Sequence, residues 1–506
     1  MKKWIKGSLI FLGTVLAAGL LACGRTSELK NELKGNTEDG PVEIAIENVT
    51  LGAQYPDTGD VEARINEITV PAIGCRVKIV NCHISEHKNQ LHLAASGTKK
   101  LDVINTGLTV SLPELVSEGA VLELNSLLED YGKGILDKNG ALLKATTIDG
   151  GIYAVFSNPY PGRASGIGYN ESIARQFGIQ VPEPLTLAAL TQIGEQLKAT
   201  DSGVYLTTQG DGALTAFDSF YDIEDFGGDF NYGVIFNPLE STEIVNVYTS
   251  EAYRDYCLTL KSWRDQGFMP QDSLISGQST QEMFNNGETF FQWSSVSPQT
   301  YSLIEKKNLS FNEVLVAMTP NRISTANIQE FAWGISSSCE HPEKAMELMN
   351  LIYTNAEVAN LLRNGREGID YVKTGERTIA YADGINSENV GYGSYFSLYG
   401  DPDQIYAFGS DVSADAVKEF AAQSVPGKTL GYVFRTEHNS PEISAVLKVV
   451  REYRPVLENG MADDVDQTLE AFNKALVEAG IETIIAENRR QLNLWLEEQN
   501  SSMPES

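Results

Sequence analysis

The sequence predicts an α/β protein whose C-terminal part is helical, and three observations lead to this prediction. From residue 41 onward, β-branched segments such as VEIAIENV (42–49) alternate with segments of helical spacing such as VEARINEITV (61–70). Strands that alternate with helices predict βαβ units and a parallel sheet. Residues 441–499 are almost wholly of helical pattern. The 506 residues, 42% of them hydrophobic, suffice for one large core or two of medium size.

The first 22 residues have the pattern of a secretory signal peptide. Three lysines lie among the first six residues, and the apolar run at 9–22 follows them. This run is shorter than the roughly 20 residues that a membrane-spanning helix needs. A charged start, a short apolar stretch and small residues before a boundary are typical of signal peptides.

The residues LLAC (20–23) resemble a bacterial lipobox, whose cysteine is diacylated before the signal is removed. We therefore expect a lipoprotein signal peptide at 1–22, lipidation of Cys23, and a lipid-anchored tether at 23–40. The tether is polar and has no aromatic residue, as a solvated linker should. The expected location is the outer face of the cytoplasmic membrane. The alternative is an ordinary signal peptide that contains a cysteine by chance.

The next elements carry the α/β pattern as far as residue 162. A turn signal ends the segment at 101–107, and the helical pattern at 112–132 is interrupted near Gly119. The segment GGIYAVFSNPYPG (150–162) is rich in Gly, Pro and aromatic residues, so it suits a rim or a crossover strand. CRVKIVNCHI (75–84) and LDVINTG (101–107) are predicted strands.

The spacing of the cysteines predicts no disulfide framework. Cys75 and Cys82 lie seven residues apart on one predicted strand, which places them roughly 23 Å apart and on opposite faces. A disulfide needs Cα atoms within about 7 Å, so these two cysteines should remain unbridged. Cys257 and Cys339 are expected to be small buried residues.

The second half of the chain continues the alternation. A loop dense in aromatic residues, Asp and Gly is predicted at 217–232. The predicted strands are 166–170, 288–293, 314–320 and 330–338, and the predicted helices are 171–178, 181–199, 249–267 and one that begins at His341.

Several longer segments resemble one known family in order and in sequence. They are LHLAASGTKKLDVINTG (91–107), GGIYAVF (150–156), GYNESIARQFGIQVPEPLTLAAL (168–190), NNGETFFQW (285–293), WGISSSCEHPEKAMELMNLIYTNAEVANLLRNGREGIDY (333–371) and the tail from LGYVFRTEHNSPEIS (430–444) onward. Together they resemble the family 1 extracellular solute-binding proteins of ABC importers, and within it the LipO-like lipoproteins with a helical C-terminal extension.

The resemblance implies a two-lobe periplasmic-binding-protein (type II) fold, with crossover strands between the lobes and a helical C-terminal extension. It implies a sugar or oligosaccharide ligand and the permease subunits of an ABC importer as partners. The implied boundaries are 41–155 for the first part of lobe 1, 156–328 for the first part of lobe 2, 329–380 for the return to lobe 1, and 381–506 for lobe 2 with the extension.

An interlobe cleft would bind a neutral sugar by stacking it on aromatic rings and by bonding its hydroxyl groups to polar side chains. Ligands of open α/β sheets lie beyond the carboxyl ends of strands, where Tyr55, Thr106 and Trp293 are expected. Each aromatic residue could instead serve the core. The candidate ligand-binding residues are Tyr55, Thr106, Phe156, Tyr160, Arg163, Asp218, Tyr221, Trp293, Tyr392 and Tyr395.

Charge and missing motifs exclude several functions. The formal net charge of -30 and the pI near 4.5 argue against binding to nucleic acid or to anionic headgroups, and they favour a soluble monomer. The sequence contains neither G-x-x-x-x-G-K-[ST] nor G-x-S-x-G, so nothing indicates nucleotide hydrolysis or a serine hydrolase. We expect binding without catalysis and without a cofactor or metal.

Three alternatives remain open. HISEH (83–87) formally fits H-x-x-E-H, a zinc-enzyme pattern, although a polar surface helix would also account for His83, His87 and His92. A peptide or another polar solute could replace the sugar as ligand. A surface sensor could use the same fold to report a ligand to a partner.

Overall fold

The computed structural model describes residues 40–51, 55–157, 161–209, 216–227, 229–271, 280–307, 309–394, 396–398, 400–409, 419–436 and 439–502. Residues 41–506 form one compact unit, and the fold is that of this unit. Cys23, Tyr160 and Tyr395, which the sequence singled out, lie outside the described residues.

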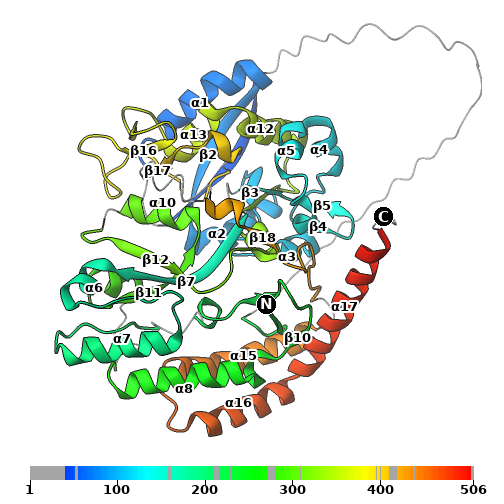
Figure 1. Ribbon diagram of the computed structural model, residues 1–506. Helices are drawn as coiled ribbons and strands as arrows, with labels where there is room; N and C mark the ends of the chain where they lie inside the picture. Colours follow the sequence, from blue (N-terminus) through cyan, green and yellow to red (C-terminus); the bar gives the residue numbers. More distant parts are fainter. Residues whose placement is uncertain are drawn as a thin grey trace, which may run out of the picture. The chain divides into compact units, whose positions relative to one another are not determined.

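Lobe 1, in the upper part of Figure 1, is built on a five-stranded sheet of order β2-β1-β3-β14-β6. Strand β1 pairs in parallel with β2 and β3, whereas β14 is antiparallel to β3 and β6. The burial of β2 alternates, as expected for a strand with one face on the core. The strands are β1 (Val42–Thr50), β2 (Cys75–His83), β3 (Val103–Asn105), β6 (Val155–Phe156) and β14 (Ala332–Ile335).

Helices and smaller strands complete lobe 1. Its helices are α1 (Thr58–Ile73), α2 (Ile84–Ala95), α3 (Leu112–Ser117), α4 (Asn125–Tyr131), α5 (Lys133–Asn139), α12 (Pro342–Thr354) and α13 (Ala356–Asn364), with the 3-10 turn η1 (Leu143–Thr146). The smaller strands and the turn beside them are β4 (Thr147–Ile148), β5 (Gly151–Ile152), β15 (Tyr371–Lys373), β16 (Thr378–Tyr381), β17 (Ala407–Phe408) and η4 (Pro402–Gln404).

Lobe 2 is built around the long strand β7 (Gly162–Asn170), and every strand that pairs with β7 does so in the antiparallel direction. The partners of β7 are β11 (Phe291–Val296), β12 (Glu313–Ala317) and β13 (Arg322–Ile323), and β18 (Val425–Pro426) extends the sheet. A second sheet contains β8 (Ile223–Asp225), β9 (Val234–Phe236) and β10 (Ile244–Val245). The prediction of a parallel sheet is therefore confirmed for β1, β2 and β3 and wrong for lobe 2.

The helices of lobe 2 cover its sheet, and the C-terminal helices pack beside them (Figure 1). The predicted helical tail is confirmed, because α15, α16 and α17 fill most of residues 440–502. The helices and turns are α6 (Glu171–Phe177), α7 (Leu187–Ala199), η2 (Phe217–Ser219), η3 (Val247–Thr249), α8 (Glu251–Asp265), α9 (Thr280–Asn285), α10 (Pro298–Lys307), α15 (Ser440–Glu458), α16 (Val465–Ala479) and α17 (Ile481–Ser502).

Two crossovers between the lobes bear on the site, and a further passage leads from β17 in lobe 1 back to β18 in lobe 2. The first leads from β6 to β7, and the second leads from β13 through the short helix α11 (Thr325–Glu330) to β14. Ser324 caps α11 by accepting a hydrogen bond from the backbone N–H of Asn327 at 3.1 Å. The second crossover therefore places a helix, with its polar side chains, between the two sheets.

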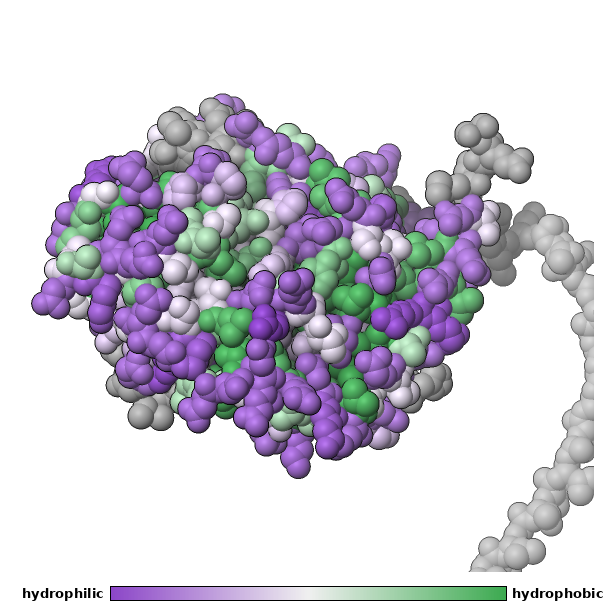
Figure 2. Space-filling view, turned by 60° about the horizontal axis from the view of Figure 1, so that its bottom comes forward, coloured by the Kyte–Doolittle hydropathy of each residue, from purple (hydrophilic) through white to green (hydrophobic). Residues whose placement is uncertain are grey.

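The cysteines and the surface follow the expectations from composition. The four described cysteines are free and buried, which confirms the absence of a bridge between Cys75 and Cys82. Hydrophilic residues predominate on the face shown in Figure 2, with hydrophobic residues scattered among them. In the part of the chain that the structure describes, no helix combines the length and the apolar character that crossing a bilayer requires.

Candidate functional site

Three adjoining cavities surround α11 between the lobes, and we call them together the interlobe cleft. The large cavity has a volume of about 540 Å³, the carboxylate cavity about 210 Å³ and the small cavity about 150 Å³. Shared residues join them: Glu330 lines the large and small cavities, Asn327 the small and carboxylate cavities, and Ala326 the large and carboxylate cavities. Each of these residues belongs to α11.

Lobe 1 contributes the loop that follows β3 to the large cavity. Gly107 and Ser111 line the cavity, and Ser111 also caps α3 by accepting a hydrogen bond from the backbone N–H of Glu114. A Cβ atom on Gly107 would lie 1.8 Å from the carbonyl oxygen of Gln329, so only glycine permits this approach of the loop to α11. The loop begins at the carboxyl end of a strand, where ligands of α/β sheets bind.

Lobe 2 and the C-terminal part contribute two aromatic pairs to the large cavity. The rings of Phe226 and Tyr432 meet edge to face at 5.4 Å, and those of Tyr232 and Phe434 meet at 5.2 Å. Tyr432 and Phe434 are buried, whereas Phe226 and Tyr232 are only partly covered. Phe226 and Tyr232 thus offer partly exposed ring surface inside the cavity.

Carboxyl groups dominate the carboxylate cavity. Asp218, Asp222, Glu224 and Asp225 line it together with Arg163 and Arg322. Burial raises the pKa of the Asp222 and Glu224 carboxyl groups, although the Arg322 guanidinium opposes the shift. Burial, with the neighbouring charges of Asp218 and Asp229, raises the pKa of Asp225 to about 7.

Both arginines of this cavity form ion pairs with carboxylates. Arg322 forms ion pairs with Glu224 and, at 3.4 Å, with Asp222, and it donates a hydrogen bond to the carbonyl oxygen of Ile223 at 2.7 Å. Arg163 forms an ion pair with Glu330 at 2.7 Å.

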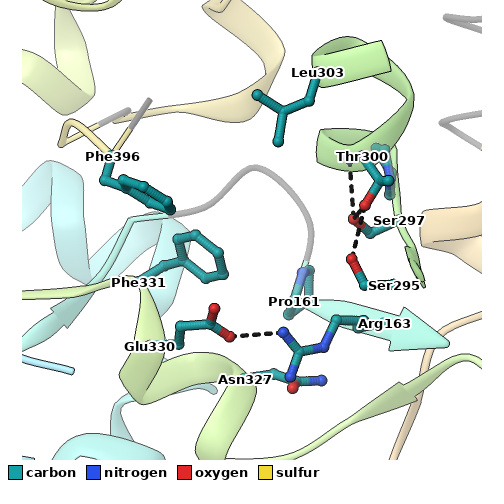
Figure 3. A pocket seen from close by; sticks show the side chains of 12 residues that line it. Pro161, Arg163, Ser295, Ser297, Thr300, Leu303, Asn327, Glu330, Phe331 and Phe396 are labelled. Atoms are coloured by element: carbon teal, nitrogen blue, oxygen red, sulfur yellow. Dashed lines mark hydrogen bonds and ion pairs between the residues drawn. The ribbon is translucent and has the colours of Figure 1, made fainter. Parts of the chain in front are cut away.

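Figure 3 shows the small cavity, with the Arg163–Glu330 pair along one side. Phe331 and Phe396 lie next to each other opposite the hydroxyl groups of Ser295, Ser297 and Thr300. The two phenyl rings are stacked with 6.3 Å between their centroids. The cavity therefore offers one apolar wall and one wall of hydroxyl groups.

The structure brings three of the predicted ligand-binding residues together. Arg163, Asp218 and Tyr221 all line the carboxylate cavity, although Asp218 and Tyr221 lie more than fifty residues from Arg163 in the sequence. The aromatic-acidic loop predicted at 217–232 supplies several further lining residues.

Four other candidates have side chains that are buried in the core and line none of the three cavities. Tyr55 packs on Tyr392 at 5.8 Å, and the Tyr392 hydroxyl donates a hydrogen bond to the carbonyl oxygen of Leu362. Phe156 is 2% exposed within a hydrophobic cluster, and fully buried Thr106 donates a hydrogen bond to the carbonyl oxygen of Ala332. Apolar or hydrogen-bonded surroundings hold all four away from the cavities.

Trp293 is partly buried on β11 and is absent from the lining of the three cavities. Its ring meets Phe220 and Phe291 edge to face, each at 4.9 Å. Tyr160 and Tyr395 lie outside the described residues.

Sequence reasoning missed the aromatic wall of residues 432–436 and the residues of α11. One indication of the aromatic wall was present in the sequence, because the aromatic segment YVF (432–434) directly precedes the helical tail. Nothing in the local pattern showed that this segment would meet Phe226 and Tyr232, more than two hundred residues earlier.

The HISEH motif takes a different form from the predicted polar surface helix. His83 precedes α2 and accepts a hydrogen bond from the backbone N–H of Ser85. His87, however, is fully buried, with Nδ1 at 2.6 Å from the Thr109 hydroxyl and Nε2 at 3.2 Å from Glu47. The expectation of a surface position is wrong for His87, because Glu47 and Thr109 give its ring buried polar partners. No cluster of three His, Cys, Asp or Glu residues suited to a metal occurs among the described residues.

Known proteins resemble this chain in sequence and in fold. Residues 85–359 match the family described as Bacterial extracellular solute-binding protein, which is more than half of the 506 residues, and residues 428–497 match a Domain of unknown function (DUF3502). A Carbohydrate ABC transporter substrate-binding protein of Streptococcus pneumoniae serotype 4 (strain ATCC BAA-334 / TIGR4) is 23% identical over 509 residues, which covers 98% of this chain and 99% of that protein.

Two solved structures illustrate the shared fold. The N-glycan transport solute binding protein (NgtS) from Streptococcus pneumoniae has a TM-score of 0.79 at 21% identity, covering 90% of this chain and 100% of that one. The alginate-binding protein AlgQ2 without calcium ion has a TM-score of 0.64 at 15% identity, covering 90% of this chain and 98% of that one. Both agree with a two-lobe periplasmic-binding-protein fold with C-terminal helices. The chain therefore belongs to the bacterial extracellular solute-binding proteins, which are receptors and not enzymes.

Proposed function

We propose that this chain is a lipid-anchored receptor that captures a carbohydrate, in the first place an oligosaccharide, in the interlobe cleft and delivers it to the permease of an ABC importer. One observation carries the proposal: the large cavity joins partly exposed aromatic rings from lobe 2 to polar groups from both lobes. The carbohydrate transporter relative from Streptococcus pneumoniae supports the same class of ligand.

The chemistry of the cleft suits a sugar. A pyranose ring has apolar C–H faces that stack on aromatic rings, and its hydroxyl groups both donate and accept hydrogen bonds. Phe226 and Tyr232 supply the rings, and the carboxylates around Arg322 supply acceptors. The volume of about 540 Å³ lies within the range of pockets that enclose most of a small ligand.

The two lobes suit capture of a ligand by closure. A ligand that touches both lobes stabilises the closed form, because only that form makes both sets of contacts. The permease would then recognise the closed form. Lipid on Cys23 would hold the receptor at the outer face of the cytoplasmic membrane, within reach of the permease.

A binding screen tests the proposal. The full-length protein, purified in mild detergent, is heated with neutral oligosaccharides and, separately, with peptides, and its unfolding temperature is recorded. A ligand at a hundredfold excess over its Kd adds about 2.7 kcal/mol to the free energy of unfolding, so a true ligand gives a clear shift. We expect an oligosaccharide to give this shift. A response to peptides with none to sugars would replace the proposed ligand class.

Tyr232→Ala then tests the aromatic wall. Removing one stacking ring should weaken sugar binding roughly tenfold, as measured by titration calorimetry. Tyr131→Ala is the matched control, because Tyr131 is exposed on α4 and lines none of the three cavities. Equal affinity of both variants for the sugar would remove Tyr232 from the binding site.

A further inference from the structure

We propose that the interlobe cleft selects glycans without negative charge, accepting neutral or amino sugars and rejecting uronates, and that Asp218 and Asp225 determine this selectivity. The inference rests on the proposed function and specifies the class of sugar. It depends on the charges that line the cleft and on which of them are neutralised by partners.

Acids outnumber bases in the lining of the cleft. The basic residues are Arg163, Arg322 and Arg435, and the acidic residues are Glu114, Asp218, Asp222, Glu224, Asp225 and Glu330. A negative ligand group would therefore enter a region of negative potential.

Each arginine is already paired with a carboxylate. Arg163 pairs with Glu330 at 2.7 Å, and Arg435 pairs with Asp149 at 2.6 Å. Arg322 pairs with both Asp222 and Glu224. A ligand carboxylate could reach a guanidinium only by displacing one of these acids, and the displaced acid would remain in the cleft.

Asp218 and Asp225 are not directly paired in this way, although the nearby charge of Arg163 partly offsets the effect of burial on the pKa of Asp218. Among the described residues, neither forms an ion pair with a lysine, arginine or histidine within 4 Å. The Oδ1 atom of Asp225 is enclosed and has no hydrogen-bond partner in the described structure. A sugar hydroxyl or an ammonium group can donate to this oxygen, whereas a ligand carboxylate cannot.

The fold itself does not determine whether the ligand is charged. An alginate-binding protein, whose ligand is a polyuronate, shares this fold with an N-glycan transport protein. Selectivity for charge must therefore come from side chains, and in this chain Asp218 and Asp225 lie at the boundary of the carboxylate cavity.

The test uses matched sugars that differ in charge. Full-length protein at pH 8, above the pKa of about 7 of Asp225, is titrated with three pairs of probes. They are β-1,4-mannotriose with β-1,4-mannuronate trisaccharide, cellotriose with its uronate counterpart, and N-acetylglucosamine trimer with glucosamine trimer. For a pair that binds, we expect the uronate to bind at least about tenfold more weakly than the neutral sugar. The glucosamine pair is compared at pH 7, where a larger share of the amino groups carries a proton, and the glucosamine trimer should then bind at least as tightly as its acetylated form.

Substitutions assign the effect to the two acids. The double substitution Asp218→Asn with Asp225→Asn should lower the preference for the neutral sugar over the uronate about tenfold, measured as the ratio of the two affinities in the same variant. Asp218→Asn alone should give part of this change in relative affinity. The single variant can be measured even if Asp225→Asn unfolds the protein. Asp130→Asn is the matched control, because Asp130 is exposed on α4 and lines none of the three cavities.

The outcomes separate this inference from the proposed function. A uronate that binds as tightly as its neutral partner overturns the charge selectivity and leaves the carbohydrate receptor standing. An unchanged ratio of the two affinities in the double variant overturns the role of the two acids. Binding of none of the paired sugars, together with a response to peptides, overturns the proposed function and this inference with it.

Discussion

At the scale of single residues, Asp225 joins the chemistry of the cleft to the stability of the protein. Its carboxyl group is mostly enclosed, and one oxygen lacks a hydrogen-bond partner in the described structure. Burial disfavours the charged form, and the nearby carboxylates of Asp218 and Asp229 disfavour it further, so its pKa rises to about 7. The folded protein without ligand is therefore strained by the ionised form of Asp225.

This strain predicts a pH-dependent difference between wild type and Asp225→Asn. A carboxyl whose pKa is raised by folding stabilises the folded state below its unfolded pKa of about 4, and this contribution is lost as the pH rises to about 7. The stability of Asp225→Asn relative to wild type should therefore grow between pH 4 and 7 and level off above. Three pKa units correspond to at most about 4 kcal/mol. Urea unfolding at intervals across this range measures the difference.

Two features make the comparison specific to Asp225. The raised pKa values of Asp222 and Glu224 are present in both proteins and largely cancel in the difference. Asp130→Asn, on the exposed surface of α4, should show no such dependence. A difference between Asp225→Asn and wild type that stays constant from pH 4 to pH 8 would contradict the assignment.

The types of residue found in loops predicted part of the candidate site but not its full extent. Arg163 was predicted from its place beside a crossover, and Asp218 and Tyr221 were predicted from the aromatic-acidic loop; all three line the carboxylate cavity. Tyr55 and Tyr392 were also predicted as aromatic residues in loops. They lie in the core instead, where the two rings pack against each other. Local sequence cannot distinguish these cases, since burial depends on segments that are distant in the chain.

At the scale of elements, α17 of the C-terminal part supports the wall of the large cavity. Asn488 accepts a hydrogen bond from the Tyr432 hydroxyl at 2.7 Å and donates one to the carbonyl oxygen of Tyr232 at 2.7 Å. Gln491 binds both the backbone N–H and the carbonyl oxygen of Arg435. The helix thereby fixes both aromatic pairs, so the C-terminal helices contribute to the binding surface and not only to the core.

Asn488→Ala should therefore impair both stability and sugar binding. Asn488 is fully buried, and its loss leaves a hydroxyl and a carbonyl group without their partners, at a cost of about 3 kcal/mol. Because Tyr232 and Tyr432 lose their fixed positions, the affinity for the sugar should fall as well. Urea unfolding and calorimetry at a temperature where the variant is folded measure the two effects. Asn493→Ala, exposed on the same helix, is the control. Lower stability with unchanged affinity would limit α17 to a structural role.

The elements that could be predicted are those whose pattern is local. The alternation in β2 and the apolar stripes of α8 and α12 are visible in the sequence, and the structure confirms them. The direction of the strands in lobe 2 was not predictable in this way. Strand β7 pairs with strands from residues 291–323, and pairing over such distances depends on the path of the chain between them.

At the scale of the whole molecule, the cleft forms between the lobes, around the crossover helix α11. Lobe 1 contributes the end of β3, lobe 2 contributes the segment 218–232, α11 of the second crossover lies between them, and the C-terminal part adds residues 432–436. Four distant segments therefore share one site, and a ligand that contacts several of them couples binding to the relative position of the lobes. The proposed lipid on Cys23 would keep such a receptor close to the proposed permease.

Replacing Cys23 tests the anchor. Each buried CH₂ group of an acyl chain contributes about 0.8 kcal/mol to membrane binding, and two chains together hold a soluble domain stably at a bilayer. Wild-type protein expressed in bacteria should therefore partition into the detergent phase of Triton X-114, whereas Cys23→Ser should appear in the aqueous phase or in the medium. Ser27→Ala, a few residues further along the polar tether, should behave as wild type. If wild type and Cys23→Ser partition alike, the cysteine carries no lipid, and the receptor must reach its permease by diffusion or by another contact.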